Sequence, residues 1–118
     1  MATVAAPQRG DIWLVRFNPS EGAEIRKIRP AIVASIDIGR LPLRIVVPVT
    51  DWRPEFAKLS WFIFLRATAD NGLSKDSGAD AFQVKSVSET RFMRKLGIVT
   101  DAQMDDIASA IAMCVGAP

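Results

Sequence analysis

The hydrophobic pattern of this chain constrains its fold more than any other feature of the sequence. Over most of the chain, short apolar runs are separated by clusters of turn-forming residues, which is typical of β-strands. Only after Thr100 do apolar residues recur at a clear helical spacing. Several short strands without intervening helices, followed by one terminal helix, predict a mainly β protein built as a small barrel or strongly bent sheet.

Five segments have the composition of strands, at residues 10–17, 30–36, 43–49, 61–67 and 79–87. The first places Ile12 and Leu14 on one face and Trp13 and Val15 on the other, so we expect it to be buried on much of both faces. The second is expected to begin at Pro30, because the first position of a strand tolerates a missing N–H. A short turn-like gap follows it, so the second and third strands are expected to form a hairpin.

Two segments near the C-terminus favour helical structure. Residues 90–97 are expected to form a short helical turn. The last element is a clear helix, because Thr100 and Gln103 have the spacing of a capping box and Gly116 marks the end. Its apolar face is expected to contain Met104, Ile107, Ala108, Ile111 and Val115. We interpret this face as part of the core.

The length of 118 residues predicts one domain, which we place at residues 9–118, preceded by a flexible segment at 1–8. No apolar run approaches the ~18 residues that a membrane helix needs. The N-terminus lacks the pattern of a signal peptide. A single cysteine rules out an internal disulfide and favours a cytoplasmic location.

The chain has no histidine, and this narrows its possible chemistry. Histidine is the commonest general acid or base and the commonest metal ligand. With only one cysteine as well, a structural zinc site is excluded, and we expect neither a metal nor another cofactor. Catalysis would rest on Arg, Lys, Asp, Glu, Ser or Thr.

The positive charge is concentrated in the body of the chain. All 15 Lys and Arg residues lie within residues 1–98, together with 10 of the 13 acidic residues, which gives that part a charge of +5. A basic body suits a polyanionic partner such as nucleic acid. The alternative is an ordinary solvated surface.

Four segments together resemble the MazF/PemK/Kid toxin family. They are "RGDIWLVRFNPSEGAEIRKIRPAIVAS", "VVPVT", "GLSKDSGADAFQVKSV" and "LGIVTDAQMDDIASAI", in this order. The resemblance covers about residues 9–116. It implies an SH3-like β-barrel with a C-terminal helix, a homodimer, and the toxin of a two-gene toxin–antitoxin pair whose partner is a cognate antitoxin. It also implies metal-independent cleavage of single-stranded RNA, in which the ribose 2′-OH attacks the phosphate and leaves a 2′,3′-cyclic phosphate and a 5′-OH.

The resemblance implies three catalytic residues. Arg29 matches the family's Arg-Pro motif, and its guanidinium offers fixed donors to the charge of the transition state. Thr50 ends the "PVT" motif and could donate its hydroxyl to a phosphate oxygen. Glu24 matches the family's Gly-x-Glu and could accept the 2′-OH proton or orient Arg29.

Five further residues are candidates for binding substrate. Arg26 and Lys27 could contact flanking phosphates, and Trp52 could stack on a base, although packing is its commoner role. Ser77 and Gln83 lie in the family-like stretch and can hydrogen-bond RNA, although turn and strand roles suit them equally.

The sequence departs from the Kid-like pattern in two places. Asp80 and Phe82 occupy positions where some members carry an Arg and an Asp that are thought to be catalytic, so that mechanism does not transfer. Asp51, beside Thr50, would repel phosphate.

Two rival functions remain open at this point. A CcdB-like gyrase poison shares the barrel, but that group relies on a Trp near its C-terminus, and this chain ends "MCVGAP". The other rival is a catalytically weak RNA-binding barrel.

Overall fold

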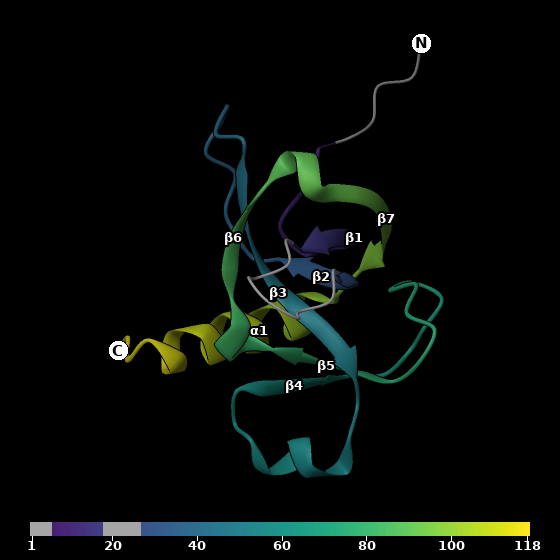
Figure 1. The fold of residues 1–118 in the computed structure, drawn as a ribbon. Helices are drawn as coiled ribbons and strands as arrows, with labels where there is room; N and C mark the ends of the chain where they lie inside the picture. The colour runs from purple at the N-terminus through teal and green to yellow at the C-terminus, as the bar shows by residue number, and fades with distance from the viewer. Residues whose placement is uncertain (1–5, 18–26) are drawn as a thin grey trace, which may run out of the picture.

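The computed structural model describes residues 6–17 and 27–118, and Figure 1 shows their arrangement. The strands are β1 (Asp11–Phe17), β2 (Lys27–Val33), β3 (Leu43–Asp51), β4 (Phe62–Leu65), β5 (Ser77–Asp80), β6 (Lys85–Ser88) and β7 (Phe92–Ile98). The helix is α1 (Asp101–Cys114), and three 3₁₀ turns are η1 (Pro54–Lys58), η2 (Ala81–Gln83) and η3 (Glu89–Arg91).

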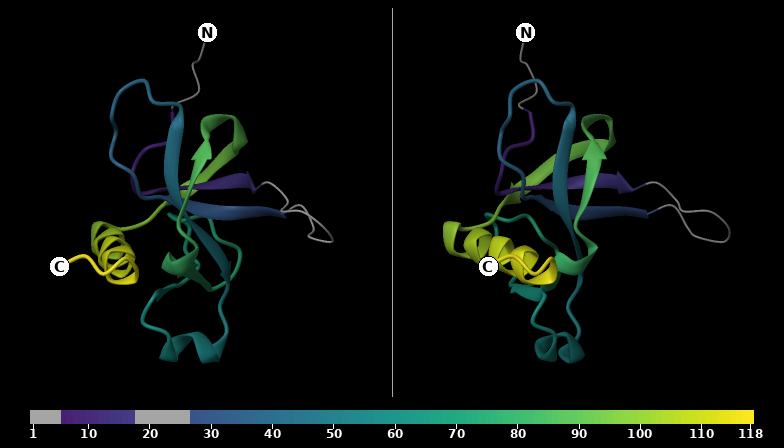
Figure 2. Two further views of the ribbon diagram at one scale, coloured as in Figure 1. Left: turned by 60° about the vertical axis from the view of Figure 1, so that its left-hand side comes forward. Right: turned by 90° about the vertical axis from the view of Figure 1, so that its left-hand side faces the viewer.

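The strands form one antiparallel sheet in the order β4-β5-β3-β2-β1-β7, and β6 also pairs with β3. The sheet bends strongly, and α1 lies along one side of it (Figure 2). Within residues 6–17 and 27–118, no pairing joins β4 to β7, so the sheet is curved but not closed. The predicted mainly β fold with a C-terminal helix is confirmed.

The predicted hairpin of the second and third strands is also confirmed, but its first strand begins earlier than expected. β2 starts at Lys27 rather than at Pro30, because Lys27 and Arg29 pair with Phe17 and Val15 of β1. Pro30 therefore lies inside the strand, opposite Leu14.

The helical turn expected at 90–97 is wrong. Only Glu89–Arg91 form a 3₁₀ turn, and the next seven residues are strand β7, which pairs with β1. An ion pair ties the two strands together, since Lys95 Nζ lies 3.2 Å from the buried carboxylate of Asp11. Long-range pairing therefore overrides the local helical preference.

The single strand expected at 79–87 is divided in two. η2 interrupts it, and Asp80 caps this turn by accepting a hydrogen bond from the Phe82 N–H at 3.1 Å. Burial raises the pKa of the Asp80 carboxyl above its ordinary value, although hydrogen bonds from the backbone of Phe82 and Gln83 favour the charged form. The interruption lets β5 pair with one end of β3 and β6 with the other.

The core consists of two hydrophobic clusters, and alternating residues of the central strands contribute to one cluster or the other. Ile12 of β1 belongs to one cluster, while Trp13 and Val15 belong to the other. The prediction that this strand is buried on both faces is confirmed. The fold therefore relies on burial on both sides of the sheet.

Helix α1 has the predicted capping box, in which the Thr100 hydroxyl accepts from the Gln103 N–H at 3.1 Å and the Gln103 side chain accepts from the Thr100 N–H at 2.9 Å. Met104 and Ile107 are buried in the first cluster. Val115 is not part of this face, because it follows the helix and is 70% exposed. No helix in the described part of the chain is long and apolar enough to span a membrane.

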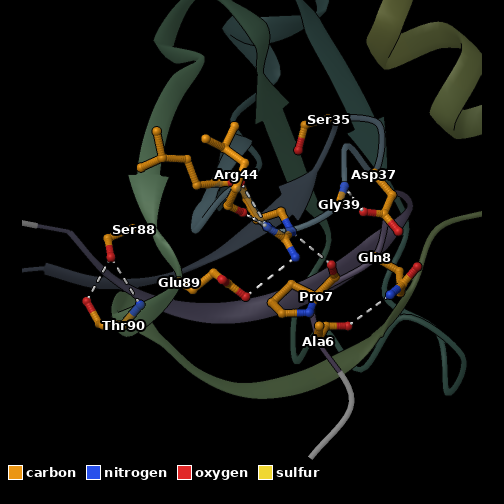
Figure 3. Close-up of polar contacts among 12 residues, drawn as sticks. Ala6, Pro7, Gln8, Ser35, Asp37, Gly39, Arg44, Ser88, Glu89 and Thr90 are labelled. Atoms are coloured by element: carbon orange, nitrogen blue, oxygen red, sulfur yellow. Dashed lines mark hydrogen bonds and ion pairs between the residues drawn. The ribbon is translucent and has the colours of Figure 1, made fainter.

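Arg44 joins three segments that are far apart in the sequence (Figure 3). Its Nε donates to the Pro7 carbonyl at 3.0 Å, and Nη1 donates to the carbonyls of Leu41 and Leu43 at 3.0 and 2.9 Å. Nη2 lies 3.5 Å from the Glu89 carboxylate. The side chain is only 11% exposed, so this cation holds the fold together rather than facing a partner.

We expect Arg44→Met to lower the free energy of unfolding by about 2–4 kcal/mol, because several charge-assisted hydrogen bonds are lost together. Arg40→Met is the matched control, since Arg40 is exposed in the same hairpin, and it should change stability by less than about 0.5 kcal/mol. Urea unfolding of the three proteins measures this difference. Equal stability of the two variants would contradict the structural role of Arg44.

Candidate active site

An open surface pocket of about 560 Å³ lies where β2 and β3 separate. It is lined by Ile28, Arg29, Pro30, Val49, Thr50, Asp51 and Arg53. Two of the residues expected to be catalytic, Arg29 and Thr50, therefore line one pocket although they come from different strands. This pocket is the candidate active site.

The separation of the two strands follows from how β3 is paired. β2 and β3 pair from Val33–Val46 to Ala31–Pro48, and the pairing ends there. Pro30 is the next residue of β2 and has no N–H to donate to a ladder. From Val49 onward β3 keeps a partner only along its other edge, where it pairs with β5. The residues beyond the last β2–β3 pair thus form two walls with open space between them.

Two guanidinium groups belong to this pocket. The backbone of Arg29 is held by pairing with Val15, and its side chain is half-buried. Arg53 is exposed and follows the end of β3. Neither forms an ion pair with any residue that the structure describes. Two guanidinium groups and the hydroxyl of Thr50 are suitable donors for an anion such as a phosphate.

Among the residues whose placement is described, Asp51 is the one acid that lines the pocket, and it has a cationic neighbour. Its carboxylate lies 3.6 Å from Lys75 Nζ, and both side chains are about 70% exposed. The pair offsets part of the negative charge beside Thr50, but water screens such an exposed contact. The repulsion of phosphate expected from the sequence is therefore reduced and not removed.

Trp52, Ser77 and Gln83 do not line this pocket. The Trp52 ring packs edge-on against Phe56 and Phe64, with ring centroids 5.7 and 5.0 Å apart. Ser77 is buried in β5, and its hydroxyl donates to the Lys75 carbonyl at 2.7 Å. Gln83 is exposed in η2.

The remaining candidates lie at or beyond the edge of the described structure. Glu24 and Arg26 lie outside the described residues. Lys27 is the first residue of β2, with its backbone opposite Phe17.

Among the residues with described placement, no group of three or more His, Cys, Asp or Glu side chains could hold a metal ion. The polar side-chain groups that the described residues bring to the pocket are guanidinium, hydroxyl and carboxylate. Arg53 was not among the candidates from the sequence. Its only signal in the sequence was its position three residues after the family-like Thr50.

Comparisons with known proteins agree with the fold. The family described as "PemK-like, MazF-like toxin of type II toxin-antitoxin system" matches residues 8–115 of this chain. Endoribonuclease MazF9 of Mycobacterium tuberculosis is 33% identical over 114 residues, covering 90% of this chain and 93% of that protein. Endoribonuclease MazF of Staphylococcus saprophyticus is 29% identical over 111 residues, covering 92% and 91%.

A solved structure shares the fold at lower sequence identity. It is an endoribonuclease in complex with its cognate antitoxin from a mycobacterial species. It is similar to this chain with a TM-score of 0.74 and 21% identity, covering 96% of this chain and 98% of that one. The family match spans nearly the whole chain and includes both walls of the pocket. This chain therefore belongs to the PemK-like, MazF-like toxins of type II toxin–antitoxin systems.

Proposed function

We propose that this chain is an endoribonuclease toxin that cleaves single-stranded RNA in the pocket between β2 and β3. The observation that supports this most directly is that Arg29 and Thr50, from two different strands, line one open pocket. Two homologous proteins of similar length are endoribonucleases, which favours RNA cleavage over gyrase poisoning or weak RNA binding.

The proposed reaction uses the substrate's own nucleophile. The ribose 2′-OH attacks the neighbouring phosphorus and loses its proton to a base. The bond from phosphorus to the 5′ oxygen breaks, and that oxygen takes up a proton, which leaves a 2′,3′-cyclic phosphate and a 5′-OH. Negative charge grows on the phosphoryl oxygens as the pentacovalent state forms. Donors placed at those oxygens lower the barrier most, because they act where the charge develops.

Separate roles in this reaction are proposed for the residues of this chain. Arg29 stays charged and stabilises the phosphoryl oxygens, and Thr50 donates its hydroxyl to one of them. Glu24 is the candidate for accepting the 2′-OH proton or for orienting Arg29. Arg26 and Lys27 would bind flanking phosphates.

The basic segment at residues 24–29 would also suit the antitoxin, which is the second partner expected of a toxin. An acidic tail of a cognate antitoxin and an RNA strand both present negative charge to residues 24–29, so an ordered tail would exclude substrate. The solved complex of a related endoribonuclease with its antitoxin supports such a partner. We further propose that the toxin is a homodimer and acts in the cytoplasm.

Arg29→Ala should lower the rate of RNA cleavage by roughly 10²–10³, the scale of removing one donor to the transition state. Thr50→Ala should have a smaller effect of the same kind. Arg94→Ala is the control, because Arg94 is exposed on β7 outside the pocket. The measurement is single-turnover cleavage by variants shown to be folded by circular dichroism. A wild-type rate in folded Arg29→Ala protein would remove the central residue of this proposal.

Cleavage should continue in EDTA, because the 2′-OH mechanism needs no metal. An RNA in which one deoxyribose replaces the ribose on the 5′ side of the cut should remain intact, since the nucleophile is gone. Gel analysis of the two substrates with and without EDTA tests both points. Loss of activity in EDTA, or cleavage of the deoxy-substituted RNA, would show that the mechanism is different.

Asp51→Asn should tighten RNA binding by about two- to fivefold at low salt, because it removes the acid of the pocket and leaves Lys75 unpaired. The gain should shrink as salt is added. Asp105→Asn is the control, since Asp105 is an exposed acid on α1. Fluorescence anisotropy with the deoxy-substituted RNA measures the affinities. Weaker binding by Asp51→Asn would indicate that the carboxylate positions the substrate instead.

A further inference from the structure

Four aromatic side chains form one surface beside the pocket, on the outer side of β4 and β5. They are Trp52, Phe56, Phe62 and Phe64, which we call the aromatic face. Phe56 and Phe62 stack with centroids 4.0 Å apart, and Trp52 meets Phe56 and Phe64 edge-on. Phe64 is the most open of the four, at 46% exposed.

The aromatic face is continuous with Thr50 of the pocket. Thr50 pairs with Gly78 of β5, and Gly78 pairs with Phe64 of β4, so the three residues form one row across the sheet. Residues directly opposite each other in a ladder direct their side chains to the same face. Thr50 and Phe64 therefore face the same way, about 10 Å apart across two strand spacings.

Gly78 leaves room for aromatic rings over the middle of this row. A Cβ there would lie 3.0 Å from the ring of Phe62 and 3.1 Å from the ring of Trp52. The absence of a side chain lets the two rings close over the middle of the row. Trp52 is thereby used in packing, which leaves Phe64 as the exposed ring.

Arg53 connects the pocket to the aromatic face. It lines the pocket and directly follows Trp52, whose N–H donates to the Asp76 carbonyl at 3.0 Å. Its own carbonyl accepts from the Phe56 N–H at 2.9 Å, and Pro54 restricts its backbone to the extended region that is observed. Arg53 thus lines the pocket from a fixed backbone, and its neighbour in the chain, Trp52, belongs to the aromatic face.

We propose that Phe64 and Arg53 form a nucleotide-binding subsite beside the catalytic pocket. One base of single-stranded RNA stacks on Phe64, and a phosphate next to that base binds Arg53. The inference rests on the proposed function and adds to it a position at which the substrate is held. The basic residues of the adjoining pocket favour RNA as the occupant, because a ring beside cations matches a stacked base beside a phosphate.

The test uses the deoxy-substituted RNA with 2-aminopurine placed at successive positions around the blocked cut. Wild-type protein should strongly quench the fluorescence of 2-aminopurine at one position near the cut, because stacking on an aromatic ring quenches the fluorescence of this base. Phe64→Leu, which keeps an apolar side chain of similar size, should lose that quenching and weaken binding by about 5- to 150-fold. Phe64→Tyr should retain both, since the ring remains.

The Arg53→Gln variant should still quench the fluorescence of 2-aminopurine. Its RNA affinity should depend less on salt, with the slope of log binding constant against log salt concentration smaller by about 0.7, because one phosphate contact is lost. Met93→Ala and Arg94→Gln are the controls. Both residues are exposed on β7, at the opposite end of the strand order from β4, and neither should change quenching or affinity.

Three results would overturn the subsite. The first is unchanged quenching and affinity in Phe64→Leu. The second is loss of self-association by Phe64→Leu in sedimentation, which would assign the aromatic face to contact with a second copy of the chain. The third is an unchanged salt slope in Arg53→Gln. Failure of the wild-type protein to cleave the unmodified RNA would instead contradict the proposed function.

Discussion

The divided pairing of β3 is the constraint on which the rest of this structure depends. This strand pairs with three others: its first residues pair with β6, its middle residues with β2 and its last residues with β5. Along one edge of β3 the partner changes from β6 to β5, and along the other edge the pairing with β2 ends at Pro48. The pocket that contains Arg29 and Thr50 is the direct result. Its position follows from backbone hydrogen bonding, before any side chain is considered.

The charged residues of the chain divide into structural and functional groups according to burial. Arg44 is nearly buried, donates to the carbonyls of Pro7, Leu41 and Leu43 and pairs with Glu89, so its charge belongs to the fold. Arg29 and Arg53 face the pocket and form no ion pair within the part of the chain that the structure describes. A basic composition alone does not separate these roles, since a guanidinium can donate hydrogen bonds to backbone carbonyls or to a phosphate.

Glycine and proline have a direct effect on the arrangement of the site. Pro30 is the first residue of β2 past the end of its pairing with β3, and Gly78 lets aromatic rings cover the middle of the neighbouring row. Each residue acts by lacking a group, an N–H in one case and a side chain in the other. The openness of the pocket and the continuity of the aromatic face therefore depend on these absences.

The features that are encoded locally could be predicted from the sequence. The alternation of β1, the hairpin of β2 and β3 and the capping box of Thr100 and Gln103 were predictable, because each depends on residues close together in the chain. The family-like motifs also identified Arg29 and Thr50 as candidates. Three features needed the tertiary structure: the strand at residues 92–98, the division of the segment 79–87 by η2, and the placement of Arg53 in the pocket of Thr50 and of Phe64 in the same row of the sheet. Those features depend on pairing between segments distant in the sequence, and no local pattern specifies which distant strands will meet.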